Sequence, residues 1–144
     1  NTRSVRLASN FVTSANTYTD VTALSFSVEA NASYNFQFFI AGSSSATTTG
    51  AAYAVNGPAS PTLITYQMQG VQSAGALIQH ATTYDFGGAA STVAIANSNY
   101  TYLIHGTLVN GPNAGTLIVR AIRGGSANNI TAKAGSSGLL VKTS

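Results

Sequence analysis

Charged residues are scarce in this chain, where Asp, Glu, Lys and Arg together make up 6% of 144 residues, against about 25% in an ordinary globular protein. Surface polarity must therefore come from Ser, Thr, Asn, Gln and Gly. These residues suit strands and turns better than exposed helices, which favour Glu, Lys and Arg. With 44% hydrophobic residues and a length that fits one core, we expect a single all-β domain over residues 1–144.

The clearest period-two pattern lies in the first third of the chain. Leu24–Val28 and Tyr34–Ile40 both alternate apolar with polar side chains, as half-buried strands do. Asn31–Ser33 lies between them, and Asn tolerates the left-handed backbone of a tight turn. The pattern predicts that the two strands form a hairpin.

Further short strands recur along the chain, separated by turn residues. Residues 41–50 (AGSSSATTTG) carry little to bury and are expected to form an exposed loop or an edge that contacts a neighbour. The pattern predicts additional strands at residues 51–56, 63–68, 76–80, 82–86, 91–96, 100–109, 116–122, 130–134 and 139–141. This regular spacing favours an antiparallel β-sandwich or jelly roll.

The charge pattern also bears on partners. A surface with few charges lacks the repulsion that keeps copies apart, so we expect self-association. The net charge of +3 comes from isolated residues with no basic run, which argues against nucleic-acid binding. No apolar run approaches the ~20 residues that span a bilayer, so no membrane insertion is expected. The N-terminus, which lacks an initiator Met, looks like that of a processed product or of a domain from a longer protein.

Residues suited to catalysis are few. The chain has no Cys, which excludes disulfides, thiolate metal sites and a Cys nucleophile. His80 and Asp85 could join a Ser in a triad, but no Gly-x-Ser-x-Gly elbow is present. Asp20 and Glu29 lie at opposite ends of one predicted strand, which disfavours a glycosidase pair. His105 is expected to be a half-buried, hydrogen-bonded strand residue. We therefore expect no catalytic residue, no metal and no cofactor.

Tyrosine is the aromatic residue best placed to bind a ligand, because the chain has seven Tyr and no Trp. A tyrosine offers an apolar face and a hydroxyl to sugars and proteins. Tyr34, Tyr100 and Tyr102 are expected in the core. The candidate ligand-binding residues are Tyr53, Tyr66 and Tyr84, with simple packing as the alternative.

Three stretches together resemble a known family: LSFSVEANASYNFQFFIAG (Leu24–Gly42), YLIHGTLVNGPNAGTLIVRAIRG (Tyr102–Gly124) and ITAKAGSSGLLV (Ile130–Val141). They are similar to a β-domain of tailed-bacteriophage virion proteins, often found at the C-terminal end of tail-fibre or other surface structural proteins. The resemblance implies a β-sandwich that assembles with copies of itself, commonly as a trimer, on the virion surface. Residues 43–90 match least, so no functional residue is transferred.

Several functions are compatible with these observations. The leading expectation is a non-enzymatic virion structural protein in a tail fibre or spike, which contacts other virion proteins and a host-surface glycan or protein. A capsid decoration protein that braces the phage head is a close alternative. A secreted carbohydrate-binding module with a tyrosine platform is a third reading, and a hydrolase is the last.

Overall fold

The computed structural model describes all 144 residues and contains eleven β-strands and no helix. The strands are β1 (Thr2–Arg6), β2 (Phe11–Thr13), β3 (Thr19–Val28), β4 (Ser33–Ser44), β5 (Thr49–Asn56), β6 (Leu63–Gln72), β7 (Gly75–Ala81), β8 (Tyr100–Val109), β9 (Gly115–Gly125), β10 (Ile130–Ala132) and β11 (Ser137–Lys142). The prediction of an all-β chain is confirmed. The short strands β1 and β2 near the N-terminus were not predicted.

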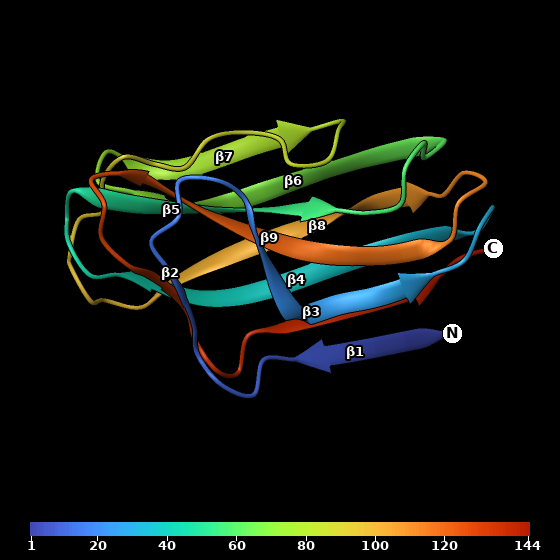
Figure 1. The fold of residues 1–144 in the computed structure, drawn as a ribbon, viewed down its shortest axis with the longest axis horizontal. Coiled ribbons are helices and arrows are strands. Elements are labelled where there is room, and N and C mark those ends of the chain that lie inside the picture. The colour runs from blue at the N-terminus through green and yellow to red at the C-terminus, as the bar shows by residue number, and fades with distance from the viewer.

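The strands form two antiparallel sheets. The large sheet has the order β1-β11-β4-β8-β6-β7, and the short strands β10 and β2 extend it beside the end of β4. The small sheet has the order β3-β9-β5. Figure 1 shows the large sheet from β7 at the top to β1 at the bottom, with the small sheet over its middle. This arrangement confirms the predicted β-sandwich.

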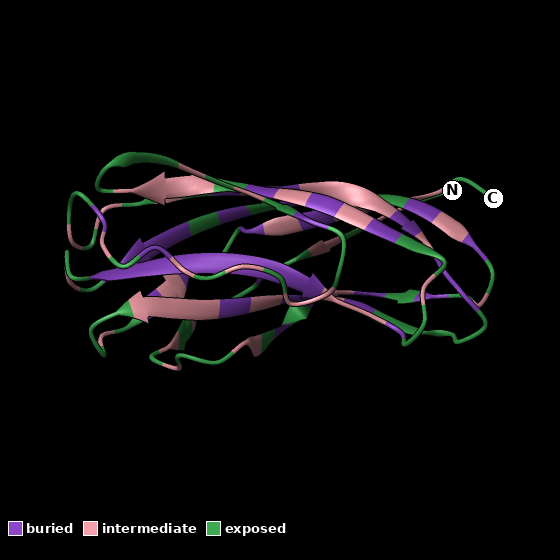
Figure 2. Ribbon diagram, turned by 90° about the horizontal axis from the view of Figure 1, so that it is seen from above, coloured by how far each residue is buried: buried purple, intermediate pink, exposed green.

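The core lies between the two sheets and takes aromatic side chains from both. Phe26 of the small sheet packs against Phe38 of the large sheet with ring centroids 5.8 Å apart. Tyr53 and Tyr102 meet edge to face at 5.0 Å. Such tilted pairs add about 0.5–1.5 kcal/mol each beyond the area that they bury. Figure 2 shows the two layers from the side, and β5 is buried along almost its whole length.

The predicted hairpin between residues 24–28 and 34–40 is wrong, although both segments are strands. β3 pairs with β9 in the small sheet, whereas β4 pairs with β8 and β11 in the large sheet. The chain crosses between the sheets at residues 29–32, where Asn31 has a φ of 58°. The Tyr34 hydroxyl accepts a hydrogen bond from the Glu29 backbone N–H at 2.9 Å and fixes this crossing. A period-two pattern specifies which face is buried but not which strand is the neighbour.

The predicted loop at residues 41–50 is mostly strand. β4 continues to Ser44 and β5 begins at Thr49, and these two side chains are 1% and 0% exposed. Small residues are required here because the backbone of a neighbouring segment approaches closely: a Cβ at Gly50 would overlap the carbonyl of Ala90. Only residues 45–48 form the loop.

Residues 82–99 do not form the two strands predicted at 82–86 and 91–96. They form an irregular segment, which we call the cover segment. The backbone N–H of Asp85 donates a hydrogen bond to the Val55 carbonyl in β5. The backbone N–H of Val93 donates to the Thr47 carbonyl in the 45–48 loop. Gln79 of β7 donates to the Gly88 carbonyl. The cover segment therefore fills the layer beside β5, under the inner side of β7, where the small sheet has no strand. Asp85, at a φ of 51°, interrupts the extended backbone that its neighbours would otherwise favour.

Gly106 of β8 provides a test of how tightly β8 packs against its neighbours β6 and β4 in the large sheet. An added Cβ would overlap the Thr65 carbonyl, lie 2.5 Å from Tyr66 Cβ and lie 2.8 Å from Phe36 Cζ. We expect Gly106→Ala to lower the free energy of unfolding by about 1–3 kcal/mol, the usual cost of overpacking, as measured by urea denaturation.

The matched control is Gly88→Ala, because nothing lies within 4 Å of a Cβ at this position. It should leave the urea midpoint unchanged. Equal stability of the two variants would contradict the close packing around Gly106.

Candidate contact surface

The outward side of the large sheet is a broad surface that we call the outer face. It consists of the strand residues that alternate with the buried ones. These are Thr2, Ser4 and Arg6 of β1; Leu139 and Val141 of β11; Asn35, Gln37, Phe39 and Ala41 of β4; Thr101, Leu103, His105, Thr107 and Val109 of β8; Leu63, Thr65, Gln67 and Gln69 of β6; and Ile78 and His80 of β7. Arg6, on an edge strand, is the one Lys, Arg, Asp or Glu residue among them.

A row of amide and imidazole side chains crosses the centre of the outer face. The strand registers place Gln37, His105, Gln67 and His80 side by side. His105 Nε2 lies 3.2 Å from Gln67 Oε1, and Gln69 Nε2 donates to the same oxygen at 2.8 Å. His105 is half-buried, so the prediction of a hydrogen-bonded strand residue is confirmed. The row presents neutral donors and acceptors whose positions are fixed by the sheet.

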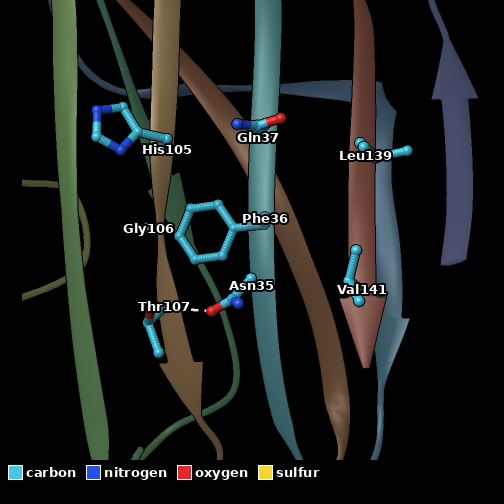
Figure 3. Close-up of a pocket in the computed structure, with 8 residues that line it drawn as sticks. All are labelled: Asn35, Phe36, Gln37, His105, Gly106, Thr107, Leu139 and Val141. Carbon is cyan, nitrogen blue, oxygen red and sulfur yellow. Dashed lines mark hydrogen bonds between the residues drawn. The ribbon is translucent and has the colours of Figure 1, made fainter. Parts of the chain in front are cut away.

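Two shallow hollows lie on either side of His105 and Thr107. The larger, of about 460 Å³, is bounded by β4, β8 and β11 and is lined in part by Asn35 and Val141. Figure 3 shows its lining, in which the Thr107 hydroxyl donates to Asn35 Oδ1 at 3.1 Å. The second hollow, of about 300 Å³, lies towards β6 and β7 and includes His80. Amides, hydroxyls and imidazoles suit neutral polar groups of a sugar or of another protein.

The acidic side chains are all engaged elsewhere. Arg120 of β9 binds Asp20 and Asp85 at 2.7 Å each, and Lys142 binds Glu29 at 2.8 Å. The hydrogen bond from Lys142 holds the pKa of Glu29 below its usual value. Exposed pairs of this kind stabilise the fold little. Because the chain has only these three acidic side chains, the outer face has no carboxylate.

Exposed apolar side chains are spread across the outer face. Phe39 is 44% exposed, Leu63 is 47% exposed and Ile78 is 61% exposed. Single exposed hydrophobic residues are common. On a six-stranded surface whose one charged residue, Arg6, lies on an edge strand, they leave apolar area that a partner could contact.

The three candidate tyrosines do not lie on this surface. Tyr53 is 1% exposed and Tyr66 is 3% exposed, and both belong to the core. Tyr84 is half-buried in the cover segment, next to Gly57. Tyr53 and Tyr66 thus have no ring face to offer a ligand, and the three rings form no shared platform. Sequence reasoning missed the outer-face residues because Gln, Thr and Asn on an alternating strand look like ordinary solvent-facing positions.

The candidate catalytic residues are also separated. His80 lies on the outer face, whereas Asp85 accepts hydrogen bonds from Asn56 and Arg120 beside the small sheet. Asp20 and Glu29 pair with different cations. The structure has no cluster of three His, Cys, Asp or Glu side chains that could hold a metal. No helix long and apolar enough to cross a membrane is present.

Comparisons with known proteins give little further guidance. No protein-family model and no curated protein matches the sequence. Among solved structures, the chain has a weak likeness to the infectious bursal disease virus VP2 subviral particle (10% identity, TM-score 0.25) and to infectious bursal disease virus Gx strain (11% identity, TM-score 0.24). Both alignments cover 97% of this chain, but only 39% and 38% of the other chains. Such TM-scores carry no information on function.

Tyr53 gives a prediction about stability. Its hydroxyl is buried without a hydrogen-bond partner, which costs about 1–3 kcal/mol. We expect Tyr53→Phe to fold normally and to match or exceed the wild type in free energy of unfolding at pH 7. If urea denaturation showed a free energy of unfolding lower than that of the wild type by more than about 1 kcal/mol, the Tyr53 hydroxyl would have a hydrogen-bond partner, contrary to this prediction.

The same variant should alter the response to alkali. Burial raises the pKa of Tyr53 above its ordinary value and raises that of Tyr102 to about 12. The unfolded chain ionises near pH 10, so stability is complete below pH 10 and is lost as the pH rises from about 10 towards 12. Tyr53→Phe removes one of these groups and should flatten the decline, measured by urea denaturation at successive pH values.

Proposed function

We propose that this chain is a non-enzymatic structural protein of a tailed-bacteriophage virion. In this proposal it forms a particle-surface domain of a tail fibre or spike and takes part in host attachment. The observation that carries the proposal is the outer face, a six-stranded surface without acidic residues on which neutral hydrogen-bonding groups and exposed apolar side chains are held in fixed positions.

The chemistry of the outer face limits what it can bind. A phosphate backbone or a charged small molecule would need concentrated charge, and Arg6 at one edge does not supply it. A flat array of Gln, Thr and His side chains can form many hydrogen bonds to a large neutral partner. The exposed ring of Phe39 and the aliphatic side chains of Leu63 and Ile78 add apolar contact. A host glycan, a host protein or another virion protein has this chemistry.

Self-association is part of the proposal, because few charges remain on the surface to oppose it. The phage resemblance leads us to propose a homotrimer. Capsid decoration is the alternative, because the same flat surface could lie against a phage shell. A secreted carbohydrate-binding module is less well supported, because Tyr53 and Tyr66 are core residues.

Binding measurements distinguish these functions. Fluorescently labelled protein would be incubated with a panel of bacterial strains and, separately, with empty capsids of tailed phages. Binding to cells is expected for the fibre or spike, and binding to capsids alone would favour decoration. Light scattering coupled to size exclusion would give the native mass. A monomer that binds neither cells nor capsids would contradict the proposal.

Gln67→Glu tests whether the outer face is the binding surface. The carboxylate keeps an oxygen for Gln69 and His105, so the fold should persist, but it adds a negative charge to the centre of the face. We expect at least a tenfold loss of binding, or about 1.4 kcal/mol. The control is Thr48→Glu, an exposed residue in the 45–48 loop. Equal loss in both variants would show that the effect is not specific to the outer face.

A further inference from the structure

The edges of the two sheets differ in how well they are protected from pairing with another strand. An unprotected edge offers free backbone N–H and C=O groups, and proteins usually block it with charge, Pro, a bulge or a covering segment. In the small sheet, the cover segment donates to β5 at Val55. The other edge, β3, has a break in register between Asp20 and Ser25, and the Arg3 guanidinium donates to the Ser27 carbonyl at 2.6 Å.

The two edges of the large sheet are unlike each other. β1 is five residues long and carries Arg3 and Arg6, and β2, which pairs with β10 on the same side of β4, has three residues. β7 (GALIQHA) has seven residues with no Lys, Arg, Asp, Glu or Pro. Its register with β6 is continuous from Tyr66–Ala81 to Gln72–Gly75. No backbone hydrogen bond is made on its other side. β7 is thus the one long edge without a protecting device.

The side chains of β7 show which side is covered. Leu77 packs against the core, and Gln79 donates to the cover segment, so the inward side is occupied. Ile78 points outward and is the most exposed large hydrophobic residue of the chain, at 61%. The cover segment therefore contacts the inward side of β7, while the backbone edge of β7 forms no hydrogen bond with it.

We propose that β7 pairs antiparallel with β7 of a second copy of this chain, so that the two large sheets become continuous. Full-length antiparallel pairing of residues 75–81 places Ile78 opposite Ile78 of the partner subunit, since it is the central residue. His80 then lies opposite Ala76 of the partner subunit, so the two imidazoles are not in direct cross-strand contact. The strand meets an identical strand with no charge on either side, so no like charges oppose the pairing.

This pairing also joins the outer faces of the two copies. The contact is isologous and has a two-fold axis at Ile78. It rests on the self-association in the proposed function and goes beyond it by naming the surface. A two-fold contact doubles the mass of whatever other assembly exists, so a monomer becomes a dimer and a trimer becomes a hexamer.

Native mass tests the proposal. Wild-type protein and Ile78→Lys would be compared by light scattering coupled to size exclusion over a range of concentrations. The exposed Lys should leave the fold intact, which circular dichroism and the urea midpoint would verify. We expect the wild type to have an even number of chains and Ile78→Lys to have half that mass.

Two matched variants locate the contact. Val12→Lys changes an exposed β-branched residue on β2, at the opposite edge, where the exposure is 53%. Phe39→Lys changes the middle of the outer face. Both should keep the wild-type mass. The pairing would be overturned if Ile78→Lys had the same native mass as the wild type. It would also be overturned if Phe39→Lys, and not Ile78→Lys, halved that mass.

A cross-link tests the register. The chain has no cysteine, so Ile78→Cys introduces a single thiol. Residues directly opposite in antiparallel strands have Cα atoms about 4.5–5.5 Å apart, which a disulfide can span. Mild oxidation should give a covalent dimer with Ile78→Cys but not with Val12→Cys. Absence of the dimer would refute the Ile78-centred register. If the wild-type protein binds cells or capsids but its native mass shows no two-fold association, the β7 proposal fails and the proposed function stands.

Discussion

The two sheets of this sandwich differ in width, and much of the remaining structure depends on that difference. A row of six strands faces a sheet of three. The inner side of the large sheet cannot face water, because its alternate residues are apolar. The cover segment closes part of the gap, held by the backbone bond from Asp85 to Val55 and by hydrogen bonds of the Tyr18 hydroxyl to the Phe86 and Gly87 carbonyls. The irregular cover segment thus covers the area of the large sheet that a further strand of the small sheet would cover, and it does not pair with β7.

Period-two alternation in the sequence was enough to predict that the fold is all-β and which face of a strand is buried. Tyr34, Phe36 and Phe38 mark the buried face of β4 directly, and scarce charge argued correctly against helices. Strand pairing could not be deduced, because alternation is the same whichever sheet supplies the neighbour. The cover segment was misassigned since its β-branched and aromatic residues favour strands locally, whereas contacts with distant parts of the chain decide its backbone. Ser44 and Thr49 looked like loop residues because small polar side chains give no sign of close backbone approach.

The candidate site was harder to predict than the fold. Tyrosine was the natural choice for a binding platform, yet the tyrosines fill the core, where Tyr53 packs on Tyr102. The outer face could be recognised only after the registers had placed Gln37, His105, Gln67 and His80 in one row. No single strand carries this signal. The same scarcity of charge that indicated a β-fold leaves both this face and the β7 edge without electrostatic protection, because all three carboxylates bind cations on other parts of the surface.

The position of β11 has a consequence for how the chain reaches its native state. Residues 137–142 lie between β1 and β4, both from the first third of the sequence. β1 therefore has no partner strand until this late segment has been synthesised. Contacts between such distant residues make folding slow, since long loops must close before the contacts form. Meanwhile, the edge of β4 that β11 will occupy stays available for incorrect pairing. Until β11 has been synthesised, this edge of β4 would therefore need to be shielded from other chains.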